Sequence, residues 1–383
     1  MSRRRMVIHM SRQDTSTRDA DAIQTPRPKW RFRLVTRGAL KRIGVFAAVV
    51  LVLGVAGWWW MIRMPGERFS GPAPGLTVEQ VRLREALRRD VERLASGVGV
   101  RSFMQPRKLG DAVAWIMDEL NVAGYATIEE VWVPAGAGAE AVAAGASFER
   151  ETVTPNLEVT VVGTSRAREI IVVGAHYDSY YMTPGADDNA SGVAGTLALA
   201  RRFANSPQER TLRFVFFVNE EPPHFQKETM GSLVYARRCR ARGDDVRAAI
   251  VLESIGYFSD APGSQPYPPP LGMFYPDRGD FVAFVGNLAS RGLVHRAISS
   301  FRARATVGSE GAAAPSFLPG IDWSDHWSFW QVGYPAVMVT CTAVYRNPHY
   351  HKATDVPGVI DYDRFTRAMD ALAGVVVDLA NGE

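Results

Sequence analysis

Cysteine is scarce in this sequence of 383 residues, which holds only Cys239 and Cys341. Two cysteines are too few for a scaffold built from disulfides, and the sequence alone does not show whether these two meet. Two common hydrolase signatures are also missing, since the chain contains neither H-E-x-x-H nor G-x-S-x-G. Any enzymatic chemistry must therefore come from a different set of side chains.

An excess of basic charge is missing from most of the chain, although the net charge is +4. Residues 1–42 hold twelve Lys and Arg against three Asp, a balance of +9, which leaves −5 on the remainder. Nucleic-acid binding by the body is not expected, because phosphate affinity requires a clustered basic face. We predict that residues 1–42 form a basic, disordered cytoplasmic tail.

Residues 43–62 form a run of twenty residues without a charge. As a helix this run would be about 30 Å long, which is the thickness of the hydrocarbon core of a bilayer. Trp58, Trp59 and Trp60 near its end suit the interfacial aromatic belt. The alternatives are a core helix, which is rarely apolar on every face, and a cleaved signal peptide, which needs small residues at its cleavage site. We predict a retained transmembrane helix.

Flanking charges predict the orientation of this helix. Five basic residues lie within residues 31–42, whereas only Arg63 and Arg68 follow closely. The positive-inside rule then leaves the tail in the cytoplasm and the body outside it, in the periplasm if the cell is Gram-negative. The lipid bilayer is thus an expected partner, and the Pro/Gly-containing residues 63–75 are an expected linker. The sequence leaves the oligomeric state open.

The body, residues 76–383, alternates between short apolar runs and helical patterns. Continuous apolar runs are typical of strands that are buried on both faces, and we expect such strands at 169–174, 212–218, 248–252 and 336–340. Helices are expected at 77–95, 109–122, 190–203, 230–242, 281–298 and 362–379, the first of them with a capping box from Thr77 and Gln80. This alternation predicts a single α/β domain with a largely parallel central sheet flanked by helices.

Other segments of the body carry weaker signals. Residues 127–133 and 157–162 are expected to form a solvent-facing antiparallel pair of strands. The segment between them, 135–147, is a low-complexity loop of small residues, and 256–275 is expected to be a long ordered loop.

Side chains that bind metals occur where predicted strands end or loops begin: His176, Asp187, Glu221, Glu253 and His351. In open α/β sheets the functional crevice lies outside the carboxyl ends of the strands. Three carboxylates and two imidazoles match a two-metal hydrolytic centre, which needs a bridging carboxylate, terminal ligands for each ion and a base. Taken singly, His176 could be structural and Asp187 could be a helix N-cap. Together they predict a dinuclear metal centre.

Further polar residues accompany these ligands. Glu220 and Glu221 are adjacent after a buried strand and would repel each other unless a cation lay nearby, so one is expected to face the metal and the other the water. The alternative is a charged loop that emerges into solvent. Asp178 is placed to accept a hydrogen bond from the His176 ring. Asp325 and His326, which precede several aromatic residues, are expected to line the pocket or brace the ligands.

The motifs HYDS…GADDNASG, NEE, LESIGYFSD, SDHWSFW and PHYH, in this order, resemble the M28 family of zinc peptidases over about residues 75–380. The resemblance implies a zinc-aminopeptidase-like fold, peptide substrates and two Zn²⁺, although Co²⁺ or Mn²⁺ would also suit these donors. It implies that His176, Asp187 and Glu253 hold one ion, with Asp187 shared, and that Glu221 and His351 complete the second site.

The resemblance also assigns the remaining roles. Glu220 would be the general base, and Tyr350 would stabilise the oxyanion. Asp188 is expected near the ligands, with a cis peptide bond between Asp187 and Asp188. One departure is Glu253, where characterised aminopeptidases often carry Asp.

Two other functions share this architecture: a single-zinc acyltransferase like glutaminyl cyclase, and a non-catalytic, receptor-like relative. The intact bridging position and His176 argue against the first. The presence of all five ligands and the base argues against the second. The sequence therefore favours a membrane-anchored, extracytoplasmic di-zinc metallopeptidase of aminopeptidase type.

Overall fold

The computed structural model describes residues 36–132, 154–269 and 271–382. The chain divides into two compact units, residues 1–55 and 56–383, and each is described by itself. Most of the predicted tail and the predicted low-complexity loop at 135–147 lie outside the described residues.

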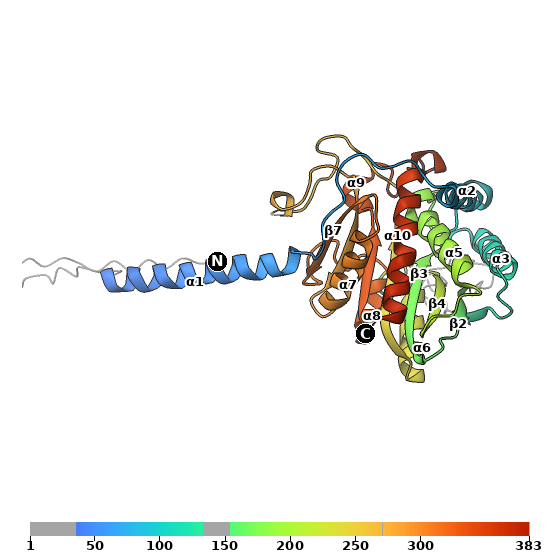
Figure 1. Cartoon of the computed structure of the whole chain (residues 1–383), viewed down its shortest axis with the longest axis horizontal. Coiled ribbons are helices and arrows are strands. Elements are labelled where there is room, and N and C mark those ends of the chain that lie inside the picture. Colours follow the sequence, from blue (N-terminus) through green and yellow to red (C-terminus); the bar gives the residue numbers. More distant parts are fainter. Residues whose placement is uncertain (1–35, 133–153, 270, 383) are drawn as a thin grey trace, which may run out of the picture. The chain divides into compact units, whose positions relative to one another are not determined.

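The first described element is helix α1, Arg37–Ile62, which contains the predicted span (Figure 1). An 18-residue window of α1 has a mean hydropathy of 2.2, and none of that window is buried. The helix is long and apolar enough to cross a membrane, and a signal sequence near the N-terminus has the same properties.

The body is built on one eight-stranded sheet in the order β1-β2-β4-β3-β5-β8-β6-β7. Parallel pairing joins β3 to β4 and β5, β5 to β8, and β6 to β7, whereas β1–β2, β2–β4 and β6–β8 are antiparallel. The predicted α/β fold with a mostly parallel sheet is therefore confirmed. The strands are β1 Glu129–Trp132, β2 Pro155–Val161, β3 Arg166–His176, β4 Arg210–Phe217, β5 Asp245–Glu253, β6 Phe281–Asn287, β7 Gly308–Ala314 and β8 Ala336–Thr340.

Helices cover both faces of this sheet because successive side chains of a buried strand point to opposite faces. Ile171 and Val173 of β3 share an apolar cluster with helices α2, α3, α5, α7 and α10, whereas Ile170 and Val172 pack with α6 and α8 (Figure 1). These helices are α2 Val78–Glu92, α3 Pro106–Val122, α5 Gly192–Phe203, α6 Gly231–Arg242, α7 Arg291–Arg302, α8 His326–Gln331 and α10 Tyr362–Asn381.

Most predicted elements are present, with three corrections. The capping box of Thr77 and Gln80 is confirmed at the start of α2. The helix expected at 281–298 is wrong, because its first half is strand β6, which pairs with β7 and β8. Strand β7, rich in Gly and Ala, was not expected. The antiparallel pairing of β1 with β2 is confirmed, but β2 is almost entirely buried rather than solvent-facing.

Both cysteines lie in the described part of the chain, and each is buried and free. Burial raises the pKa of the Cys341 thiol, so this thiol stays protonated at neutral pH.

Candidate metal centre

The carboxyl ends of three neighbouring parallel strands carry the polar side chains of the site. His176 is the last residue of β3 and Glu253 the last of β5, while Glu220 and Glu221 follow the end of β4 after two intervening residues. Asp188 lies in the short turn η2, Ala186–Ser191, that leads into α5. Since β3 pairs with both β4 and β5, these strand ends lie together at one edge of the sheet.

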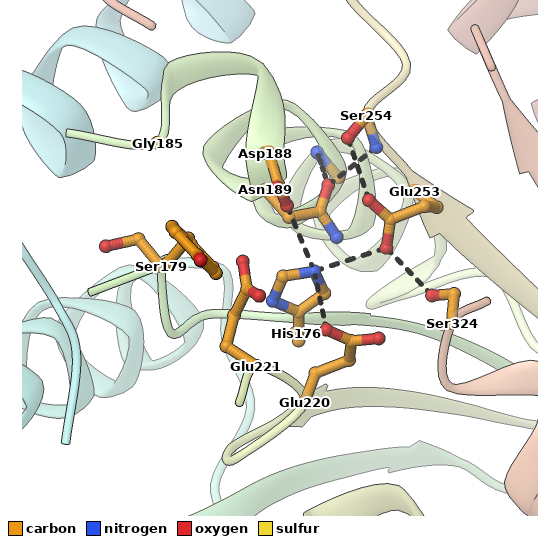
Figure 2. A network of polar contacts seen from close by, with 12 residues as sticks. His176, Ser179, Gly185, Asp188, Asn189, Glu220, Glu221, Glu253, Ser254 and Ser324 are labelled. Carbon is orange, nitrogen blue, oxygen red and sulfur yellow. Dashed lines mark hydrogen bonds and ion pairs between the residues drawn. The ribbon is translucent and has the colours of Figure 1, made fainter. Parts of the chain in front are cut away.

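Two groups of possible metal ligands share one carboxylate. The first group is His176, Asp188 and Glu253, and in it the His176 Nε2 atom lies 3.2 Å from Glu253 Oε2 and 3.4 Å from Asp188 Oδ1 (Figure 2). The second group is Asp188, Glu221 and His351, and in it the His351 Nε2 atom lies 3.1 Å from Asp188 Oδ2 and 3.5 Å from Glu221 Oε2. Each oxygen of Asp188 thus faces a different imidazole, which is the geometry of a bridging ligand.

The neighbouring Asp187 does not take the place that the family resemblance implied for it. Its Oδ1 accepts a hydrogen bond of 2.8 Å from the Gly256 N–H, and its Oδ2 accepts one of 2.8 Å from Asn347 Nδ2. Neither ligand group contains it. The geometry therefore places Asp188, rather than Asp187, between the two groups of possible ligands. The cis peptide bond is likewise one residue later than expected, between Asp188 and Asn189.

Two carboxylates hold the turns that carry the ligands. Asp355 accepts hydrogen bonds from the backbone N–H groups of Asp187 (2.9 Å) and Asp188 (3.1 Å). Asp178 does the same for Glu220 (3.2 Å) and Glu221 (3.1 Å). The spacing of Asp178 to His176 predicted a contact with the imidazole, and His176 Nδ1 lies 3.2 Å from the Asp178 carbonyl oxygen and 3.5 Å from Asp178 Oδ1. Asp355 was not expected at the site, because the sequence carries no signal for it.

Two serines orient Glu253. Its Oε1 accepts a hydrogen bond from Ser254 Oγ, and its Oε2 accepts one from Ser324 Oγ, both at 2.8 Å (Figure 2). Ser324 is the first residue of the SDHWSFW motif. This serine, rather than the following Asp325, forms the hydrogen bond with Glu253.

His351 is held by aromatic stacking. Its ring lies between Tyr180 and Tyr350, with ring centroids 3.8 Å away on each side and interplanar angles of 8° and 18°. The expected site residue Tyr350 is therefore present at the centre, next to the second ligand group. Tyr180 was not expected there.

Asp325 and His326 lie behind the site at the start of α8, and both are fully buried. His326 donates from Nε2 to the Ile321 carbonyl oxygen (2.7 Å) and packs edge-on against Trp330, away from the ligands. Burial raises the pKa of Asp325 to about 7, and its charge contributes to the raised pKa of Glu220. Asp325 thus acts on Glu220 through its charge, whereas the contacts of His326 are with Ile321 and Trp330.

The site concentrates negative charge out of water. Burial raises the pKa of Glu221 to about 8, and burial together with the charges of Glu221 and Glu253 raises that of Glu220 well above its usual value. Burial alone would lower the pKa of His176, but Glu253 and Glu220 raise it well above normal. Such a cluster requires compensating cations.

Divalent metal ions fit this cluster of residues. Among the described residues, the buried Glu221 Oε1 and His351 Nε2 atoms have no hydrogen-bond partner, so each is free to bind a cation. Carboxylate and imidazole donors suit Zn²⁺, Co²⁺ and Mn²⁺. The fold and the paired ligand groups therefore define an α/β protein with a site of the dinuclear metallohydrolase type.

The family follows from sequence comparison. Residues 156–376 match the model of peptidase family M28, and the chain belongs to this family. It is 40% identical over 223 residues to YfbL of Escherichia coli, an uncharacterized protein, covering 56% of this chain and 67% of YfbL.

Two further relatives are more distant. Leucine aminopeptidase 1 of Trichophyton equinum is 26% identical over 248 residues, which cover 61% of this chain and 60% of the fungal protein. The crystal structure of LapB from Legionella pneumophila has a TM-score of 0.60 at 18% identity, covering 82% of this chain and 78% of LapB. The fungal protein is an aminopeptidase by name, and the structural similarity to LapB supports the fold.

Proposed function

We propose that this protein is a membrane-anchored, extracytoplasmic di-zinc aminopeptidase that releases N-terminal residues from peptides. The observation that carries the proposal is the position of Asp188, whose two oxygens face two complete ligand groups. In this assignment His176 and Glu253 would hold one ion, Glu221 and His351 would hold the other, and Asp188 would contribute to both sites.

Each residue around the ions has a role in peptide hydrolysis. Zinc held by these residues would supply a water of lowered pKa and a Lewis acid for the scissile carbonyl. Glu220, 3.9 Å from His176 Nε2, is placed to take a proton from the attacking water and to return it to the leaving amine. Tyr350 stabilises the negative charge that develops on the carbonyl oxygen.

A cavity beside these residues supports an apolar N-terminal side chain in the substrate. It measures about 200 Å³ and adjoins both Glu253 and Tyr350. Much of its wall is apolar, with Phe281, Leu318 and Met338 among the lining residues. We expect faster release of N-terminal Leu than of N-terminal Asp or Lys, because a charged side chain would lose its hydration in this cavity.

Metal content tests the dinuclear centre. Because two ligand groups share Asp188, the fully active chain purified in detergent is expected to hold two equivalents of zinc, measured by mass spectrometry of the metal. Activity on aminoacyl substrates should rise in step with loading. One zinc in the fully active protein, with cyclisation of peptides that begin with Gln, would instead favour the glutaminyl-cyclase-like alternative.

Membrane fractionation tests the anchor. The full chain is expected to stay with membranes in alkaline carbonate, because twenty uncharged residues at 43–62 can span the hydrocarbon core. A chain that begins at residue 70 is the matched control and should remain in the supernatant. N-terminal sequencing of the membrane-bound protein should recover the residues before α1. A mature protein that begins after Ile62 would mean that α1 is a cleaved signal sequence.

A further inference from the structure

The segment that follows α1 is bound to the body. Arg302, the last residue of α7, donates from Nη1 to the carbonyl oxygens of Met64 (3.4 Å), Pro65 (3.1 Å) and Gly66 (3.0 Å). Its other nitrogens donate to Ser309 of β7, so the guanidinium is fixed on both sides. We call residues 64–68 the strap.

Arg68 fixes the other end of the strap. It forms ion pairs with Asp280 (2.5 Å) and with Glu310 of β7 (3.4 Å), and all three side chains are partly buried. The first part of the expected linker, residues 63–75, is therefore attached to the body rather than free. The body cannot swing on these residues without breaking both sets of contacts.

The strap fixes which surface of the body lies near the end of α1. Met64 follows Ile62, the last residue of α1, by two residues. An extended chain covers at most about 3.5 Å per residue, so Met64 lies within roughly 7 Å of the helix end. If α1 spans the bilayer, as the proposed function holds, the surface around Met64 lies at the membrane interface.

Exposed apolar side chains lie on segments of the chain that border one cavity together with Ile62 of α1. Met273 (80% exposed) and Phe274 (47%) lie between β5 and β6, Phe317 (82%) and Trp323 (42%) follow β7, and Val344 (43%) lies in helix α9, Ala343–Arg346. We call these five residues the apolar rim. Exposed apolar patches in soluble proteins mark binding surfaces, and aromatic side chains favour the membrane interface.

One cavity joins part of the apolar rim to the end of α1 and to the metal centre. Trp323 and Val344 of the rim line the cavity of about 200 Å³ that reaches Glu253 and Tyr350. Ile62, which belongs to the same compact unit as the body, lines it as well. Part of the rim is thus next to the last residues of α1 and beside the cavity that reaches the site.

Basic side chains lie beside Pro65 of the strap. A second cavity is lined by Pro65 together with Arg247, His295, Arg296 and Arg304. Arg304 is paired with Asp378, and Arg247 with Glu169 and Asp245. Arg296 is exposed and forms no ion pair with any residue in the described part of the chain. Cationic side chains near a bilayer attract anionic headgroups.

From these contacts we infer that the body docks on the bilayer surface through the apolar rim and is held in that orientation by the strap. The occupant of the rim is lipid, because covalent continuity through residues 62–64 brings this surface to the membrane. The cavity that leads to the metal centre then opens at the bilayer, and peptides whose apolar N-termini lie at the membrane surface are the substrates that reach it directly.

Site-directed fluorescence on the full chain tests the docking. The native cysteines are buried, so a single cysteine at an exposed position can be labelled selectively. The labelled positions are Met273→Cys and Phe317→Cys in the rim, with Val122→Cys as the matched control, since Val122 is an equally exposed apolar residue (84%) of helix α3. Each chain carries an environment-sensitive fluorophore and is reconstituted into vesicles of phosphatidylcholine and phosphatidylglycerol with and without nitroxide lipids.

We expect both rim labels to shift to the blue and to be quenched by nitroxide lipid, while the control label stays in water. Arg302→Ala, which frees the carbonyls of the strap, is expected to reduce the quenching at both rim positions. Rim labels as water-exposed as the control, on a chain that alkaline carbonate leaves in the vesicles, would overturn the docking alone. A chain that carbonate removes from the vesicles would overturn the anchor and the docking with it. Equal quenching with Arg302→Ala would overturn the role given to the strap.

Discussion

Replacement of Glu220 by Gln is expected to lower kcat by about 10²–10⁴-fold while both metals stay bound. Gln keeps the size and most of the hydrogen-bonding capacity of Glu but cannot accept the proton of the attacking water. Because this proton moves only on the way to the transition state, the loss should appear in kcat far more than in KM. Steady-state kinetics and metal analysis of the same preparation measure the two effects.

The structure supports this separation of roles within the NEE motif. Glu220 lies beside His176 and in front of Asp325, whereas Glu221 lies beside His351 and has a buried oxygen without a partner among the described residues. Asp178 binds both backbone N–H groups, so either substitution leaves the turn in place. Any difference between the two variants therefore reports on the side chains.

Glu221→Gln is the matched variant, and it should lose metal together with activity. An amide offers one oxygen and no charge, so the second ligand group would be left with one carboxylate and one imidazole. If Glu220→Gln released metal while Glu221→Gln kept both ions, the two roles would be exchanged and the mechanism proposed above would be wrong.

The sequence identifies the ligands that end buried strands because such strands are visible as apolar runs. His176 and Glu253 terminate β3 and β5, and the parallel pairing of these strands brings both side chains to the same edge. The same reasoning fails for β6, since an apolar run such as FVAFVGN can be a strand or part of a helix. Its pairing with β7 and β8 decides the outcome, and β7 lacks the residues that favour strands.

The choice between Asp187 and Asp188 could not be made from the sequence for a different reason. The two carboxylates are adjacent in a turn, and Asp188 has a non-helical backbone (φ −108°, ψ 92°) that no local pattern predicts. Asp355, far along the chain, fixes both backbone N–H groups, while Gly256 and Asn347 occupy the Asp187 carboxylate. Only the assembled fold therefore determines which carboxylate faces the two imidazoles.

The positions of Asp187 and Asp188 predict a large difference between two variants, Asp188→Asn and Asp187→Asn. Asp188→Asn is expected to lose both metals and to reduce peptidase activity to background, because one carboxylate faces both His176 and His351 and an amide cannot bridge two cations. Asp187→Asn is expected to retain two equivalents of metal. The Asp187→Asn variant is instead expected to be less stable than the parent. The NH₂ group of the new amide would face a hydrogen-bond donor, either the Gly256 N–H or Asn347 Nδ2. An unsatisfied buried polar group lowers the free energy of unfolding by about 1–3 kcal/mol.

Metal analysis at equal protein concentration, with thermal unfolding of the metal-free chains, separates these two outcomes. A cooperative thermal transition of the metal-free Asp188→Asn chain would show that this variant folds. We expect it at a lower temperature than that of the parent, because His176 and His351 hold the pKa of the Asp188 carboxyl below its usual value and the variant loses both ion pairs. Loss of metal from this variant would then reflect the missing ligand rather than a misfolded site. Loss of both metals from Asp187→Asn, with full loading of Asp188→Asn, would return the bridging role to Asp187 and contradict the assignment of both ligand groups.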